Sequence, residues 1–330
     1  MTAPGGPLCG TPVGVVGIGN MGLGLALRLR DAGQPVQVHD LDASRCALAA
    51  AAGAVVAQTP ASAAAGCSLL LVVVVDAAQT EAVLFGPAGA AAALAPGAAV
   101  MLCPTLGPAD VERLAQRLQA LGLGCIDAPM SGGPARARDG QISLMVACSD
   151  ALWAQHAPLL QHLAAGLWRI SSRPGDGART KLVNNLLAAI NLAGAAEALA
   201  LASQLGLDPA TTLAVIEQSS GQSWIGSDRL ARALAGDFAP RAHTTLLAKD
   251  TALALAMAAQ AGLAPALGSQ AAAVFQAALA AGYGAEDDAR LFSLLDQQFS
   301  QQLSQQLKQQ ALARLAPAPT PQPVLPEAPP

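Results

Sequence analysis

The first half of the chain alternates short apolar runs with longer segments whose apolar residues recur every three or four positions. The run Leu69–Val75 is wholly apolar, as expected for a strand that is buried on both faces of a parallel sheet. Strands are predicted at Val13–Gly17, Val36–His39, Leu69–Val75, Ala98–Cys103, Cys125–Asp127, Ile142–Cys148 and Leu167–Ile170. Helices are predicted between them, near residues 21–32, 44–52, 79–84, 108–121 and 150–163. This alternation indicates a Rossmann-type, doubly wound α/β domain over residues 11–174.

The pattern changes at the Pro-Gly pair that ends at Gly175. A proline-free segment from Ala178 to Leu205 predicts one long helix that joins the two halves of the chain. Residues 175–296 should form an all-helical substrate and dimerisation domain, and residues 297–330 a Gln-rich helix followed by a disordered Pro-rich tail. The remaining helices of the second half are predicted near 209–218, 226–235, 244–261, 266–281 and 287–312.

Composition and charge narrow the class of protein. The formal net charge is -4, and the arginines are scattered without forming a basic stripe, so no nucleic-acid partner is expected. The apolar segments are mostly alanine and are interrupted by polar residues, so no membrane partner is expected either. No positive residue precedes Arg28, which argues against a signal peptide. The six cysteines lack paired spacing, which is typical of a reduced, cytoplasmic protein.

The four histidines show no metal-ligand spacing, and no metal is expected. His156 and His162 fall within a predicted helix, and we place both on its surface.

A glycine-rich loop follows the first strand, with the sequence Gly17-Ile18-Gly19-Asn20-Met21-Gly22. A GxGxxG sequence alone is also typical of an ordinary turn, but here a strand precedes it, a helix follows it, and a second strand ends at Asp40. In a dinucleotide-binding loop Gly17 allows the tight turn, Gly19 lets the backbone approach a pyrophosphate, and Gly22 lets the helix pack on the strand. The helix N-terminus would present free N–H groups to the phosphates.

Asp40 lies 18 residues after Gly22, at the end of the second strand. A carboxylate at this place binds the ribose hydroxyls and repels a 2′-phosphate. No arginine follows it directly, and Arg45 is the nearest, so the sequence favours NAD over NADP as the cofactor. The alternative is that Asp40 only caps the following turn.

The chain contains only three lysines, Lys181, Lys249 and Lys308. Burial can lower the pKa of a lysine until it exchanges protons near neutrality, which arginine cannot do. Lys181 lies early in the long helix and shares one helical face with Asn185. Lys181 can handle the proton of a substrate oxygen that Asn185 orients. An interhelical hydrogen bond is the alternative explanation for asparagine in this apolar helix.

A second polar loop, Asp127 to Gly133, directly follows a strand. It lies at the carboxyl edge of the predicted sheet, where open α/β domains bind their ligands. The hydroxyl of Ser131 and the backbone N–H groups beside it suit a substrate carboxylate. An ordinary turn is the alternative.

Taken together, these residues resemble the β-hydroxyacid dehydrogenase family, which includes 3-hydroxyisobutyrate, threonate and tartronate-semialdehyde enzymes. The similarity extends over residues 12–295, and the segments Val75–Glu81 and Ser220–Trp224 look most like the threonate branch, although Asp76 stands where that branch has asparagine. The matching motifs, in the family's order, are the dinucleotide loop Gly17–Gly22, the DxPVSGG loop at Asp127–Gly133 with Met130 in place of valine, the K-x-x-N-N motif Lys181–Asn185, and the pair Lys249-Asp250.

The resemblance implies a role for each matched residue. Lys181 would be the general acid–base and Asn185 would orient the substrate. The substrate carboxylate would be held by Ser131, Gly132 and Gly133, and the cofactor would contact the glycine loop, Asp40, Thr105 and Lys249. The implied reaction is oxidation of a small 3-hydroxy acid such as L-threonate or 3-hydroxyisobutyrate, with hydride transfer to NAD, in a homodimer or homotetramer.

Two other functions stay open from the sequence. A reductase of an aldehyde acid such as tartronate semialdehyde would use the same residues in the reverse direction. A non-catalytic NAD(P)-binding sensor would need the glycine loop and Asp40, but it would not need Lys181, Asn185 and Ser131 together. Imine reductases share the architecture, but their family pattern lacks the lysine.

Overall fold

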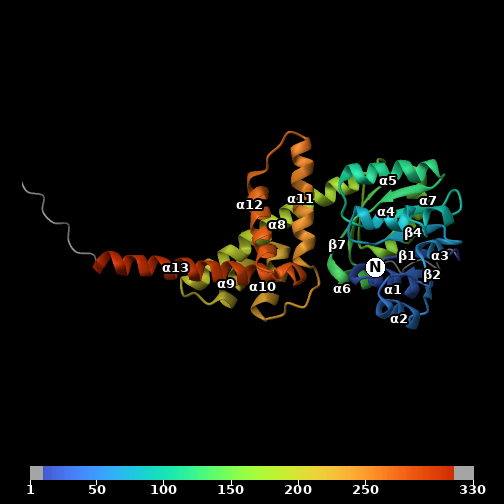
Figure 1. The fold of residues 1–330 in the computed structure, drawn as a ribbon. Helices are drawn as coiled ribbons and strands as arrows, with labels where there is room; N and C mark the ends of the chain where they lie inside the picture. The colour runs from blue at the N-terminus through green and yellow to red at the C-terminus, as the bar shows by residue number, and fades with distance from the viewer. Residues whose placement is uncertain (1–9, 316–330) are drawn as a thin grey trace, which may run out of the picture.

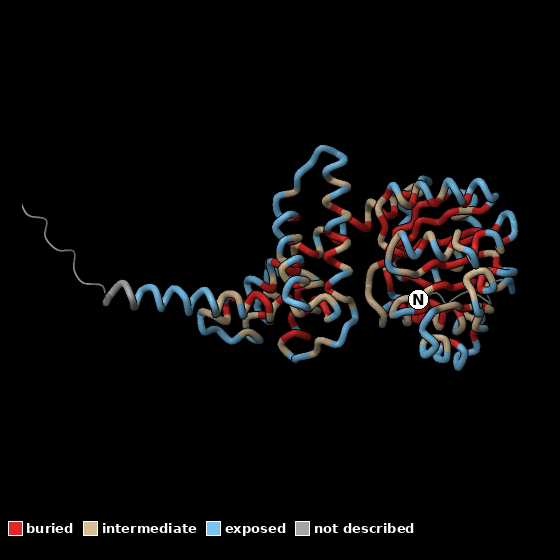
Figure 2. The backbone as a smooth tube through the Cα atoms, in the orientation of Figure 1, coloured by how far each residue is buried: buried red, intermediate tan, exposed pale blue. Residues whose placement is uncertain are grey.

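The computed structural model describes residues 10–315 (Figure 1). It contains an α/β domain and a helical domain, which are joined through the long helix α8 (Asp176–Gln204). The last helix, α13 (Leu291–Leu315), projects away from the helical domain, and its residues 301–310 are exposed (Figure 2). The predicted long connecting helix is therefore present.

The sheet of the α/β domain has nine strands in the order β3-β2-β1-β4-β5-β6-β8-β7, with β9 paired to β8. From β3 to β6 all neighbouring strands are parallel. The order reverses at β1, so that the crevice for a ligand opens at the carboxyl ends of β1 and β4. The six parallel strands are β1 (Val13–Val16), β2 (Val36–His39), β3 (Val55–Val56), β4 (Leu69–Val72), β5 (Ala99–Leu102) and β6 (Gly124–Asp127).

The remaining three strands extend the sheet beyond β6. β8 (Ser143–Ala147) runs antiparallel to β6 and to the short β7 (Met130–Ser131), while β9 (Gly166–Ser171) is parallel to β8. The predicted parallel, doubly wound sheet is confirmed over its main part. Its antiparallel end follows from the connection between β6 and β8, which lacks the long crossover helix that a parallel pair requires.

Seven helices cover the two faces of this sheet (Figure 1). Alternation along β4 shows the two faces clearly, because Leu69 and Leu71 join one buried cluster while Leu70 and Val72 join the other. The prediction that β4 is buried on both faces is confirmed. The helices are α1 (Asn20–Asp31), α2 (Ala43–Ala51), α3 (Pro60–Ala64), α4 (Ala77–Phe85), α5 (Pro108–Ala120), α6 (Gly133–Arg138) and α7 (Asp150–Leu163). The sequence pattern missed β3, β7, α3 and α6, which are too short to show a period.

The helical domain packs α9 to α13 around α8. Its core includes Leu192 and Leu199 of α8, Leu230 of α10 and Phe275 of α12. The further helices are α9 (Pro209–Glu217), α10 (Trp224–Leu234), α11 (Thr244–Gln260) and α12 (Ala266–Ala280), with short 3-10 turns at Tyr283–Ala285 and Asp288–Arg290. Within the described part of this domain the only β pairing is an isolated bridge between His243 and Asp287. The all-helical prediction is confirmed.

One sequence expectation is wrong. His156 is buried rather than on the helix surface, because it lies on the same face of α7 as Leu160 and Leu163, which pack into the core. Helix α8 is long and apolar enough to cross a membrane by length and composition alone, with a mean hydropathy of 1.6. In the structure it is the central helix of the domain, and five other helices pack against it.

The predictions for the C-terminal segment can be compared with the structure only as far as residue 315. The predicted Gln-rich helix is observed as the outer part of α13, whereas the predicted Pro-rich tail lies outside the described residues. The five described cysteines form no disulfide, and Cys9 lies outside the described range.

Candidate active site

The glycine loop between β1 and α1 is shaped by two glycines and left open by a third. Gly17 has φ +86°, and a Cβ there would lie 2.5 Å from the carbonyl oxygen of Val73. A Cβ on Gly22 would lie 1.9 Å from the carbonyl oxygen of Gly17. A Cβ on Gly19 would meet nothing within 4 Å. The outer two glycines are therefore required by the protein's own packing, while the backbone at Gly19 is open to a ligand.

The start of α1 fits the pyrophosphate of a dinucleotide. Gly19 is the N-cap residue of α1 and offers no side-chain cap. The first N–H groups of a helix have no partner within the helix, and they bind phosphate where no side chain caps them. The structure places Asn20, Met21 and Gly22 in the first turn of this helix, directly after the open approach at Gly19.

Asp40 follows β2 and supports the glycine loop. Its carboxylate accepts hydrogen bonds from the backbone N–H of Ile18 at 2.6 Å and of Asp42 at 2.9 Å. The alternative role of Asp40 in the following turn is thus present as well. An ionised carboxylate has acceptor sites for about four hydrogen bonds, which leaves places for ribose hydroxyls. Arg45 also reaches this site, because its Nη2 donates to Oδ1 of Asn20 at 2.8 Å.

Lys181 is buried in α8, with 7% of its surface exposed. Burial lowers the pKa of Lys181, the charge of Asp250 opposes this shift, and the charge of Lys249 adds to it, so that the resulting pKa is about 8. A lysine of this kind is populated in both protonation states near neutral pH. It can therefore act as an acid or as a base.

Asp250 of α11 links the polar residues around Lys181. Asn185 donates from Nδ2 to Oδ2 of Asp250 at 2.6 Å. Lys249 forms an ion pair with Asp250 at 2.8 Å, and its Nζ also donates to the carbonyl oxygen of Thr105 at 2.7 Å. Thr105 follows β5, so this contact joins the helical domain to the α/β domain. The structure thus gathers Lys181, Asn185, Lys249 and Thr105 at the junction between the domains.

The hydrogen bond between Asn185 and Asp250 agrees with both explanations of Asn185. It is an interhelical hydrogen bond, which was the alternative explanation for Asn185. It also fixes the amide of Asn185 one helical turn from Lys181, as its proposed orienting role requires. The linking role of Asp250 was not predicted, and its only signal in the sequence is its position directly after Lys249.

Asp127, at the end of β6, anchors the start of α8. It is 1% exposed, and its Oδ2 accepts from the backbone N–H of Gly175 at 2.8 Å and of Ala178 at 3.1 Å. Burial raises the pKa of Asp127 to about 6, although these backbone hydrogen bonds oppose the shift. A Cβ on Gly177 would lie 2.6 Å from the carbonyl oxygen of Met145, so α8 starts in close contact with the sheet. Lys181 follows one turn later, in a position that Asp127 sets.

The predicted substrate loop lies in the turn between β7 and α6. Ser131 ends β7, and Gly132 and Gly133 have φ values of +138° and +80°, which L residues rarely adopt. Among the described residues, no hydrogen bond joins this loop to Lys181 or Asn185. The structure therefore places the loop directly after β7, at the end of the sheet.

Comparisons with known proteins agree with this geometry. Residues 12–172 match the family model described as the NAD binding domain of 6-phosphogluconate dehydrogenase. Residues 175–295 match the model described as NAD-binding of NADP-dependent 3-hydroxyisobutyrate dehydrogenase. The chain is also 37% identical over 283 residues to L-threonate dehydrogenase of Escherichia coli (strain K12), which covers 86% of this chain and 94% of that protein.

The chain belongs to the β-hydroxyacid dehydrogenase family. A crystal structure of 3-hydroxyisobutyrate dehydrogenase from Salmonella typhimurium matches with a TM-score of 0.82 and 36% identity, covering 86% of this chain and 99% of that one. A structure of Psf3 in complex with NADP+ and 2-OPP matches with a TM-score of 0.79 and 27% identity, covering 86% of this chain and 99% of that one. Family membership makes the chain a hydroxyacid dehydrogenase that uses a nicotinamide cofactor. The resemblance and the enzyme class predicted from the sequence are confirmed.

Proposed function

We propose that this β-hydroxyacid dehydrogenase oxidises a small 3-hydroxy acid, with NAD as the hydride acceptor and Lys181 as the general acid–base. The observation that carries the proposal is the state of Lys181, which is buried, has a pKa of about 8, and lies beside Asn185 at the domain junction. A sensor without turnover would have no use for a buried lysine held in this state.

Each residue of the proposed site has its own role in the reaction. The bound nicotinamide supplies the acceptor for the hydride that leaves the carbinol carbon. Neutral Lys181 accepts the hydroxyl proton of the substrate, and in the reverse direction its ammonium returns a proton to the carbonyl oxygen. Asn185, held by Asp250, orients this oxygen. Ser131 and the N–H groups of Gly132 and Gly133 bind the carboxylate.

L-threonate is the first substrate to test, because the chain is 37% identical to an L-threonate dehydrogenase over most of both chains. The name of the Salmonella relative makes 3-hydroxyisobutyrate the second. An aldehyde-acid reductase would use the same residues in the reverse direction.

For the cofactor, we propose NAD ahead of NADP. Asp40 places a negative charge at the end of β2, where it would repel a 2′-phosphate. Arg45, which contacts Asn20, is the observation that favours NADP. Comparing kcat/KM for the two cofactors decides between them, and in Asp40→Ser the preference should move toward NADP.

We also propose that the enzyme is a homodimer or homotetramer and needs no nucleic-acid or membrane partner. Val183 and Leu187 lie four residues apart on α8 and are 61% and 57% exposed. Covering such a stripe by a second copy removes apolar surface from water. Sedimentation of the purified chain measures the number of subunits, and a strictly monomeric enzyme would contradict the proposal.

The proposed function is tested by offering the enzyme a panel of hydroxy acids with each cofactor. The rate of cofactor reduction is measured by the absorbance of the reduced nicotinamide. The panel contains L-threonate, D-glycerate, 3-hydroxyisobutyrate and 3-hydroxypropionate. Turnover of one of them with NAD supports the proposal and names the substrate. Bound NADH without turnover on any member, and without reduction of the matching aldehyde acids, would support the sensor instead.

A further inference from the structure

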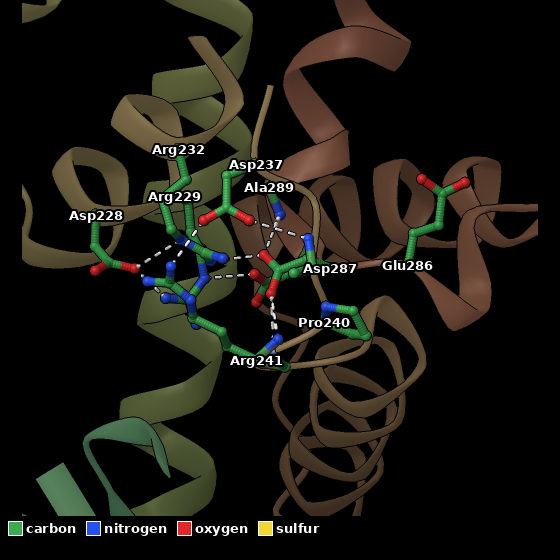
Figure 3. A network of polar contacts seen from close by, with 12 residues as sticks. Asp228, Arg229, Arg232, Asp237, Pro240, Arg241, Glu286, Asp287 and Ala289 are labelled. Carbon is green, nitrogen blue, oxygen red and sulfur yellow. Dashed lines mark hydrogen bonds and ion pairs between the residues drawn. The ribbon is translucent and has the colours of Figure 1, made fainter. Parts of the chain in front are cut away.

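Two neighbouring ion pairs join α10 to the segment before α13 (Figure 3). Arg232 donates from Nη2 to Oδ1 of Asp287 at 2.6 Å, and Arg229 pairs with Asp288. Both carboxylates are almost fully buried, with 0% and 2% of their surfaces exposed. The two pairs are therefore alike in burial and in partner type.

Of the two aspartates, Asp287 alone also binds the loop between α10 and α11 through its side chain. Its Oδ2 accepts from the backbone N–H of Arg241 at 2.8 Å and of Ala242 at 3.2 Å. Burial alone would raise the pKa of Asp287, but Arg232 and the backbone N–H donors together hold it at about 2. The carboxylate is therefore charged at neutral pH and is a strong acceptor for this loop.

Backbone hydrogen bonds complete the attachment. Asp288 donates its N–H to the carbonyl oxygen of Ala242 at 3.1 Å, and Thr244 donates its N–H to that of Glu286 at 2.9 Å. Residues 240–244, which we call the junction segment, are thus fixed along residues 286–288.

The junction segment connects the two halves of the cofactor site. Its residue Pro240 accepts a hydrogen bond from Nδ2 of Asn20, at the start of α1, with a length of 3.4 Å. Its other end, Thr244, begins α11, and Lys249 and Asp250 follow in the next turns. A shift of the segment would therefore move the Asn20 contact and Lys249 together.

We propose that Asp287 is a positioning residue for cofactor binding, because it holds the junction segment between the glycine loop and the start of α11. The inference rests on nicotinamide binding by the family fold and is independent of the proposed substrate.

The test compares Asp287→Asn with Asp288→Asn in the full chain. In each variant the buried residue keeps its size and loses its charge, and the neighbouring arginine loses one of its two carboxylate partners, because Asp228 pairs with both arginines. In Asp287→Asn an NH2 group replaces one of two oxygens that both accept from backbone N–H groups, Oδ2 from Arg241 and Ala242 and Oδ1 from Ala289. At least one of these backbone contacts is therefore lost, and the attachment of the junction segment weakens. We expect Asp287→Asn to weaken NADH binding, measured by fluorescence titration without substrate, by roughly tenfold, and Asp288→Asn to leave it nearly unchanged.

Kinetics add a readout that a purely structural role would not produce. Asp287→Asn should raise KM for the oxidised cofactor more than it lowers kcat, while both variants lower the melting temperature. Equal effects of the two substitutions on NADH affinity, or no effect of Asp287→Asn, would overturn the proposal. Because NADH binding is measured alone, an incorrect substrate assignment leaves this result intact.

A measurement on the unmodified chain covers the case in which Asp287→Asn does not fold. Hydrogen exchange of the N–H groups of Arg241 and Ala242 should slow when NADH is added, because the bound cofactor stabilises the junction segment in its attached position. Unchanged exchange in residues 241–244, with slowed exchange at the glycine loop, would overturn the proposal.

Discussion

The glycine loop and the surroundings of Lys181 are the two parts of the proposed site, and they are built in different ways. The loop acts through its backbone, and its shape depends on local sterics at Gly17 and Gly22. The surroundings of Lys181 act through side chains from α8 and α11, and they depend on contacts across the domain junction such as the one from Lys249 to Thr105. Substitutions in the first region should therefore affect the cofactor, and those in the second should affect the proton transfer.

The largest expected effect is that of Lys181→Ala. Removing a general acid–base lowers kcat by about 100- to 10,000-fold, while the glycine loop keeps its affinity for NADH. The control is Lys308→Ala, because Lys308 lies on the exposed part of α13. Steady-state rates and NADH titration measure both effects. Wild-type turnover in Lys181→Ala would contradict the role of Lys181 as general acid–base. Loss of NADH binding in this variant would contradict the claim that the two regions act independently.

The two ends of the glycine loop offer a matched pair. Gly22→Ala places a methyl group against the backbone of Gly17, so we expect a loss of about 1–3 kcal/mol in the free energy of unfolding, as in overpacked cores. Gly19→Ala meets no protein atom and should leave stability unchanged. It should still weaken NADH binding by roughly tenfold or more, because the methyl group takes space near the pyrophosphate. Denaturant titration and NADH titration separate the outcomes. Unchanged NADH affinity in Gly19→Ala would contradict binding of the pyrophosphate at Gly19.

Asp127→Ala tests the connection between the sheet and α8. The variant leaves buried N–H groups of Gly175 and Ala178 without a partner, and each such group costs about 1–3 kcal/mol of stability. The start of α8 should shift, and kcat should fall by roughly tenfold, because a small misplacement of a reacting group is costly. NADH affinity should be unchanged.

Asp176→Asn is the control for this variant, because it changes a carboxylate at the same helix start whose arginine partners are exposed. A fall in kcat as large in Asp176→Asn as in Asp127→Ala would show that the anchor at Asp127 has no special role.

The smallest expected effect is a shift in pH dependence. The rate of oxidation should rise with pH through about 8, because Lys181 must be neutral to accept the proton. Lys249→Met removes a charge that lowers the pKa of Lys181, so the midpoint should move up. Asp250→Asn removes a charge that raises this pKa, so the midpoint should move down. Profiles of kcat/KM against pH measure both shifts, and shifts in the same direction would contradict the account.

The two regions also differ in how much of them the sequence could predict. The glycine loop and Asp40 lie within one continuous βαβ segment, so motif and context were enough to predict them. Lys181 and Asn185 were predicted as well, because polar residues stand out in an alanine-rich helix.

The partners of these residues were not predicted. Asp127 and Asp250 act over separations of 48 and 65 residues, and nothing in their local sequence marks those contacts. The antiparallel β8 and the burial of His156 likewise depend on tertiary packing rather than on local periodicity.

The central claim is that Lys181 is held in a state that exchanges protons near neutral pH. Because the chain has only three lysines, NMR of their labelled side chains can follow each of them through a pH titration. The signal that disappears in Lys181→Met identifies Lys181. A midpoint near 8 for this signal in the folded enzyme is the predicted result, and a midpoint near the ordinary lysine value of about 10.4 would contradict the account.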